Sequence, residues 1–150
     1  MTPQSLFPES QTERVEALDQ EIVRLIHGQP GGPFEQCLSS DEQAVLSAIR
    51  FRRGAKNAVT IREMRSRLQL SDREIKGIVR ALRISWHLPI GSSKDSVDGG
   101  YFLILSAEDQ EVFDANFLDQ IRAQVQAHRC VSGPARTREL LGQLSLEVAK

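Results

Sequence analysis

Three cationic side chains, Arg73, Lys76 and Arg80, lie three and four residues apart, with Gly77 among them. At about 100° per residue, this spacing places them within about one quadrant of a helix. Arg83 flanks that quadrant. The apolar residues of the same segment fall on the opposite side: Ile75, Ile78, Val79 and Leu82. The pattern predicts a helix with one buried face and one face that meets a polyanion.

The chemistry of such a face is that of DNA recognition. Arginine can fork onto guanine O6 and N7, and both lysine and arginine neutralise phosphates. Gly77 lowers helix propensity by about 1 kcal/mol relative to alanine, but it would permit close approach of the backbone to DNA. The alternative is a solvated helix surface, on which Gly77 is a tolerated substitution. We favour DNA contact because three cations share one face.

The distribution of charge supports a polyanion-binding centre. The chain of 150 residues has a net charge of −1, yet the stretch 38–104 holds twelve cations and seven anions, a net charge of +5. The flanks hold the remaining seven cations and thirteen anions, a net charge of −6. A basic middle between acidic ends is typical of a nucleic-acid binder. An Arg-rich solvated surface is the other interpretation.

Further cations surround the predicted recognition helix. Arg50, Arg52 and Arg53 end the first helix of the central stretch, which begins near Ser39, and Lys56 follows it. These cations either complement the dipole of that helix or flank a phosphate track. Lys94 is the one cation in the polar loop 91–100. The predicted DNA-binding residues are Arg53, Lys56, Thr60, Arg62, Ser71, Arg73, Lys76, Gly77, Arg80, Arg83 and Lys94.

Three capping signals predict the helices that position this face. Ser39 and Glu42 open a helix that ends near Gly54, with Val45, Leu46 and Ile49 turned inward. Thr60 and Glu63 open a second helix that closes at Leu70, with Ile61, Met64 and Leu68 as its buried stripe. Ser71 and Glu74 open the third, cationic helix after a tight turn.

The flanks of these helices complete the expected organisation. A helix over 12–27 has an apolar stripe of Val15, Leu18, Ile22 and Leu25, and a Gly/Pro linker follows at 28–33. Apolar runs at 88–90 and 101–104 predict a two-stranded hairpin, followed by a helix from Ser106 to Gly133 and another over 137–148. We expect an N-terminal segment at 1–36, a central domain at 37–104 and C-terminal helices at 105–150.

The order of these elements is that of a winged helix-turn-helix. From Ser40 to about Val125 the chain resembles the small winged-helix proteins of bacteria and their phages. The resemblance rests on Asn57-Ala58-Val59-Thr60 before the second helix, Leu88-Pro89-Ile90-Gly91-Ser92-Ser93 entering the wing, Gly99-Gly100-Tyr101-Phe102-Leu103 leaving it, and Ser106-Ala107-Glu108-Asp109 opening the next helix. It implies a mainly α fold with a small β-hairpin wing (α+β). These proteins often have glycine where the third helix ends; His87 stands there and tolerates the left-handed conformation.

Other classes of protein and site are disfavoured. The composition, 40% hydrophobic and 26% charged, is that of a globular protein. No apolar run approaches the roughly 20 residues of a membrane helix, and the first residues do not have the pattern of a signal peptide. Cys37 and Cys130 are expected to be reduced thiols of a cytoplasmic protein. The three histidines are isolated and no catalytic motif is present, so we expect no enzyme, metal, cofactor or small-molecule substrate.

Two functions remain. The first is binding of double-stranded DNA by the third helix (71–84) in the major groove, in regulation of transcription or of mobile-element or phage replication. The alternative is a winged-helix interaction module in a multi-subunit complex, without DNA binding. We also expect a homodimer through the helix that begins at Ser106, supported by the N-terminal helix. In the monomeric alternative, both helices pack on the central domain.

Overall fold

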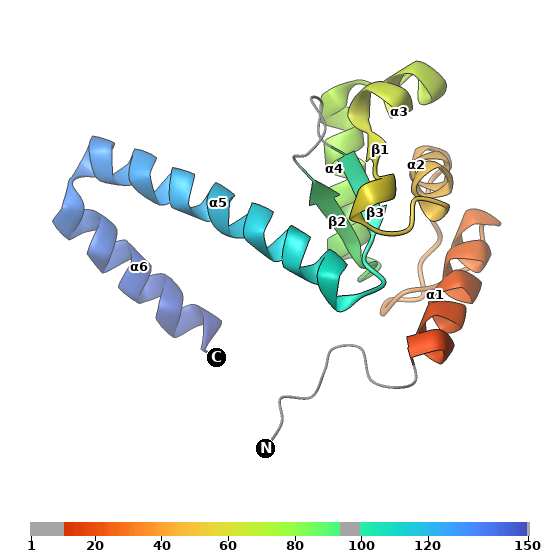
Figure 1. The fold of residues 1–150 in the computed structure, drawn as a ribbon, viewed down its shortest axis with the longest axis horizontal. Helices are drawn as coiled ribbons and strands as arrows, with labels where there is room; N and C mark the ends of the chain where they lie inside the picture. Colours follow the sequence, from red (N-terminus) through yellow and green to blue (C-terminus); the bar gives the residue numbers. More distant parts are fainter. Residues whose placement is uncertain (1–10, 94–99, 150) are drawn as a thin grey trace. The chain divides into compact units, whose positions relative to one another are not determined.

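The computed structural model describes residues 11–93 and 100–149. They form two compact units that divide between Phe113 and Asp114, and each unit is described by itself. The chain is mainly helical with a small three-stranded antiparallel sheet, which confirms the predicted α+β class (Figure 1). In the part of the chain that is described, no helix is both long and apolar enough to cross a membrane.

The first unit holds most of the elements. They are α1 (Gln11–Ile26), α2 (Ser40–Arg50), the 3-10 turn η1 (Ala55–Asn57), β1 (Val59–Thr60), α3 (Ile61–Leu68), α4 (Asp72–Ile84), β2 (Ile90–Ser93), β3 (Gly100–Leu103) and the start of α5 (Ala107–Ser132). Its main core consists of Ile22, Leu25, Leu38, Val45, Leu46, Ile49, Val59, Met64, Ile75, Val79, Leu82, Trp86, Leu88, Ile90, Tyr101 and Leu103. The predicted inward stripes of α2, α3 and α4 all contribute to it.

The sheet has the strand order β1-β3-β2, so β3 lies in the middle. Its register pairs Val59 with Tyr101 and Gly91 with Phe102. Only glycine fits at position 91, because the ring of Phe102 comes so close to the backbone that a Cβ there would lie 2.6 Å from its Cζ. The ring of Phe102 therefore lies directly over the backbone of the neighbouring strand.

The predicted caps are present at the starts of α2 and α4. Ser39 with Glu42, and Ser71 with Glu74, form reciprocal capping boxes. At α3 only half of the box forms: Oγ1 of Thr60 accepts from the backbone N–H of Glu63, while the Glu63 carboxylate accepts a hydrogen bond from Arg52 at 2.9 Å. The two oxygens of that carboxylate have different partners: Oε2 accepts from Arg52, and Oε1 accepts from the Thr60 hydroxyl at 3.5 Å.

Helix α1 belongs to the core of the first unit. Ile22 and Leu25 of the predicted stripe are completely buried against the other helices. This part of the stripe is therefore covered by the protein's own chain, which is the packing of α1 that the monomeric alternative predicts. Burial of two such side chains stabilises the unit by about 3–6 kcal/mol.

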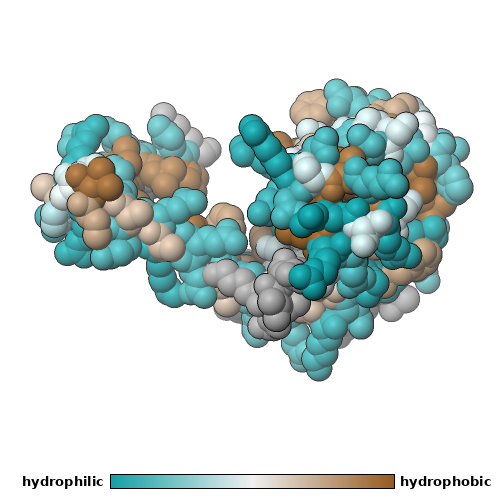
Figure 2. All heavy atoms as spheres, turned by 90° about the horizontal axis from the view of Figure 1, so that it is seen from above, coloured by the Kyte–Doolittle hydropathy of each residue, from teal (hydrophilic) through white to brown (hydrophobic). Residues whose placement is uncertain are grey.

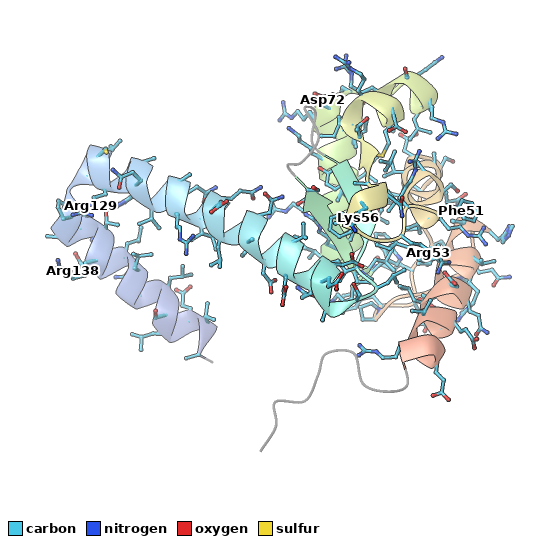
Figure 3. All side chains as sticks on the ribbon, viewed as in Figure 1. Phe51, Arg53, Lys56, Asp72, Arg129 and Arg138 are labelled. Atoms are coloured by element: carbon cyan, nitrogen blue, oxygen red, sulfur yellow. The ribbon has the colours of Figure 1, made fainter. Side chains whose placement is uncertain are left out.

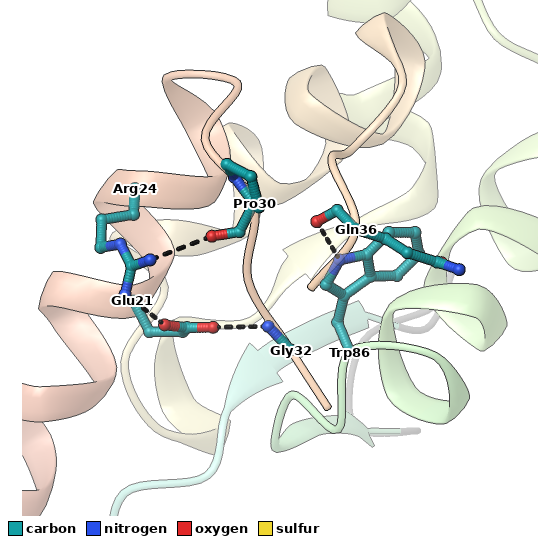
Figure 4. A network of polar contacts seen from close by, with 6 residues as sticks. All are labelled: Glu21, Arg24, Pro30, Gly32, Gln36 and Trp86. Atoms are coloured by element: carbon teal, nitrogen blue, oxygen red, sulfur yellow. Dashed lines mark hydrogen bonds and ion pairs between the residues drawn. The ribbon is translucent and has the colours of Figure 1, made fainter. Parts of the chain in front are cut away.

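The Gly/Pro segment after α1 is held by polar contacts (Figure 4). Glu21 accepts a hydrogen bond from the backbone N–H of Gly32 at 2.8 Å, and Arg24 donates to the carbonyl of Pro30 at 3.0 Å. The indole N–H of Trp86 donates to the carbonyl of Gln36 at 3.4 Å. The segment predicted as a linker is thus held against α1 through Pro30 and Gly32, and Trp86 packs beside the residues that follow it.

The second unit contains most of α5 and all of α6 (Pro134–Val148). Helix α6 begins three residues before the predicted start, because Gly133 takes a positive φ of 88° and Pro134 occupies the first helical turn. Figure 2 shows apolar residues interspersed over the surface of this unit. Cys37 and Cys130 are both free and exposed.

Candidate nucleic-acid interface

The outward face of α4 carries Arg73, Lys76, Gly77 and Arg80, and all four are exposed. On the opposite side Ile75, Val79 and Leu82 are buried in the core. The predicted division of this helix into an apolar and a cationic face is therefore present. Ser71 caps the helix N-terminus, so the cations begin within its first turn.

The three cations of this face are not engaged within the protein. Arg73, Lys76 and Arg80 make no hydrogen bond or ion pair with any residue that the structure describes. In contrast, six other arginines hold carboxylates: Arg24, Arg52, Arg53, Arg65, Arg122 and Arg136. Cations that are exposed and uncommitted can neutralise the phosphates of a ligand without first breaking an internal contact.

Arg83, which the helical wheel places beside the cationic quadrant, makes contacts within the protein. Its Nε–H donates to the carbonyl of Ile90 at 2.8 Å, and its guanidinium lies 5.8 Å from the ring centroid of Tyr101 and 5.4 Å from that of Phe113. Burial lowers the pKa of Arg83, although the neighbouring Tyr101 opposes this effect. Arg83 directly follows the buried Leu82 in α4, and its side chain turns toward the sheet rather than toward solvent.

Arg53 is also committed to structure. Its guanidinium pairs with the carboxylate of Asp19 on α1, 34 positions earlier in the chain. The backbone around Arg53 is anchored as well, because Gly54 donates to the carbonyl of Leu103 at 3.1 Å. Arg53 is thus a link between α1 and the segment after α2, whereas Lys56 nearby is exposed (Figure 3).

The other predicted site residues lie at the start of α3, around the α3–α4 turn or outside the described chain. Arg62 and Ser71 line one open hollow of about 620 Å³, together with Arg65, Ser66, Gln69 and Leu70. Thr60 and Ser71 act as helix caps, so their hydroxyl oxygens accept backbone hydrogen bonds. Lys94 lies outside the described residues.

Two features of this region were not predicted from the sequence. Ile84 follows Arg80 by one helical turn and is 59% exposed, so it places an apolar side chain on the cationic face. Such a side chain can contact a thymine methyl group. Gln69 ends α3 in the left-handed conformation, at a φ of 55°, which produces the tight turn into α4. His87 takes the same conformation after α4, as predicted, at a φ of 52°.

Replacement of Gly77 tests whether the space beside the cationic face of α4 is open. A Cβ built there meets no atom within 4 Å, and the residue lies inside α4. Substitution Gly77→Ala is expected to raise the free energy of unfolding by about 0.5–1 kcal/mol, because alanine is the better helix former. Chemical denaturation of the two proteins measures the difference. An unchanged or lowered stability would mean that Gly77 meets an obstacle absent from this structure.

Among residues 11–93 and 100–149, no cluster of three or more His, Cys, Asp and Glu side chains could hold a metal ion. No protein-family model, curated protein sequence or solved structure matches this chain.

Proposed function

We propose that this protein binds double-stranded DNA through α4, as a winged helix-turn-helix protein. In this proposal α3 and α4 form the helix-turn-helix and the β2–β3 hairpin forms the wing. The observation that carries the proposal is the exposed group of Arg73, Lys76 and Arg80, which has no partner among the described residues. The buried opposite face holds this helix rigidly on the core, so the cations are presented at fixed spacing.

The dimensions of the helix support insertion into the major groove. An α-helix with its side chains is about 10–12 Å wide, and the major groove of B-DNA is about 12 Å wide. Gly77 in the middle of the cationic face removes bulk where the backbone would come nearest to the bases. Arg62 and Arg65 line the hollow beside the α3–α4 turn, and Arg65 would exchange Asp72 for a phosphate that borders the groove. The function that follows is regulation of transcription or of mobile-element or phage replication.

The salt dependence of binding tests this function. Three phosphate contacts would give a slope of log affinity against log salt of about −2.7, which is a loss of about 40-fold between 50 and 200 mM salt. Fluorescence anisotropy of the full chain with a labelled duplex of random sequence measures this slope. Absence of binding at 50 mM salt would overturn the proposal and favour the interaction module, in which α4 contacts a protein.

A further inference from the structure

An apolar side chain is exposed on α4 without a packing role. Among residues 11–93 and 100–113 of the first unit, the exposed large apolar side chains are those of Phe34, Phe51 and Ile84. Of these three, Ile84 lies on α4, where it is the last residue of the helix and is 59% exposed. It belongs neither to the main core nor to the partly buried residues that pack against that core. Core packing therefore does not explain an isoleucine at this position.

The angular position of Ile84 places it within the cationic face. At about 100° per residue, Ile84 lies about 20° around the helix from Arg73 and from Gly77. Arg80 precedes it by one turn and is about 40° away, whereas the buried Leu82 is about 160° away. An apolar side chain thus stands among the residues that we propose to enter the major groove.

The end of α4 is held in place, so the side chain of Ile84 is presented at a fixed position. The preceding Arg83 donates from its Nε–H to the carbonyl of Ile90 at 2.8 Å, and Leu82 is completely buried. Isoleucine is branched at Cβ, which restricts its χ1 angle in a helix to essentially one rotamer. Ile84 therefore loses little conformational freedom when it contacts a ligand.

The chemistry of this side chain limits what it can recognise. Isoleucine has no charge and no hydrogen-bonding group, so Ile84 cannot bind a phosphate. In the major groove, guanine, adenine and cytosine present hydrogen-bond donors and acceptors, whereas thymine also presents an apolar C5-methyl group. A polar base edge placed against Ile84 would lose its hydrogen bonds to water without replacement. Thymine is therefore the base that best fits Ile84.

We propose that Ile84 contacts the C5-methyl group of a thymine, and so gives the protein a preference for DNA sites with thymine at one position. The inference rests on the proposed function, because it requires α4 to lie in the major groove. A rise of about 1.5 Å per residue puts Ile84 about 6 Å along the helix from Arg80, which is about two base-pair steps of DNA. The thymine is expected about two base pairs from the pair that Arg80 contacts.

Replacement of thymine by deoxyuridine tests this contact, because the two bases pair alike and differ by the methyl group alone. A duplex is first selected from a random pool with the full chain, and is then synthesised with each thymine replaced in turn. Fluorescence anisotropy is expected to show about fourfold weaker binding when the contacted thymine is replaced, which corresponds to one buried methyl group. Equal affinity for all these duplexes would overturn the inference and leave the proposed function standing. Absence of binding to every duplex would overturn both.

Variants of Ile84 test whether this side chain makes the contact. Ile84→Ala is expected to bind the thymine and deoxyuridine duplexes equally, whereas Ile84→Val keeps a branched side chain and most of the difference. Phe51→Ala is the matched control, because its ring is also exposed but lies at the end of α2, and it is expected to keep the fourfold difference. Thermal unfolding checks that each variant folds. A fourfold difference that persists in I84A would assign the methyl contact to another residue and overturn the inference.

Discussion

The triple variant R73E/K76E/R80E is expected to lose at least about 100-fold in affinity for duplex DNA, from about 1 kcal/mol or more for each contact. All three side chains are exposed and make no internal contact among the described residues, so their reversal removes nothing that holds α4 in place. Surface changes of this kind alter stability by within about 0.5 kcal/mol each. Anisotropy titration measures the affinity, and thermal unfolding checks the fold.

A second triple variant separates the interface from bulk charge. R50E/R129E/R138E produces the same change in net charge on α2, α5 and α6, outside α4. It is expected to bind DNA much more tightly than R73E/K76E/R80E. If the α4 variant melts normally and binds as the parent does, α4 is not the interface. Equal losses in both variants would mean that binding follows net charge alone.

The local signals in the sequence were sufficient to predict α2, α3 and α4. Ser39 and Ser71 each accept the backbone hydrogen bond that starts the next helix, and this contact spans only three residues. The 3-4 spacing of Ile75, Val79 and Leu82 likewise depends on helix geometry alone. Such features are visible in a single sequence because the atoms that interact are close along the chain.

The roles of individual cations depend on contacts that no local pattern contains. Arg53 pairs with Asp19, and Arg83 donates to the carbonyl of Ile90 beyond the end of its own helix. On a helical wheel Arg83 borders the cationic quadrant, and only the position of the sheet decides that it turns inward. The exposed Arg73, Lys76 and Arg80 were predicted correctly because the core lies on the opposite side of α4.

Strand β3 gives the largest expected effect on stability. Alternate residues of a strand point to opposite faces, so Phe102 lies on the other face from Tyr101 and Leu103, which belong to the main core. Phe102 is nevertheless completely buried, and all four residues of β3 are buried. The uninterrupted apolar run 101–104 is therefore explained by burial on both faces of the central strand.

Substitution Phe102→Ala is expected to lower the free energy of unfolding by about 3–5 kcal/mol, a large share of the roughly 5–15 kcal/mol of a typical domain. The ring lies over Gly91 of β2, and that glycine cannot fill the cavity left behind because it has no side chain. Phe51→Ala is the matched control: its ring is 70% exposed and contacts the Arg50 guanidinium at 4.7 Å, a contact of about 0.5–1 kcal/mol. Denaturant unfolding measures both variants. Similar unfolding midpoints for F102A and F51A would contradict the burial of β3 on both faces. Removal of the Phe102 ring costs more than removal of the exposed Phe51 ring only if other residues pack around Phe102.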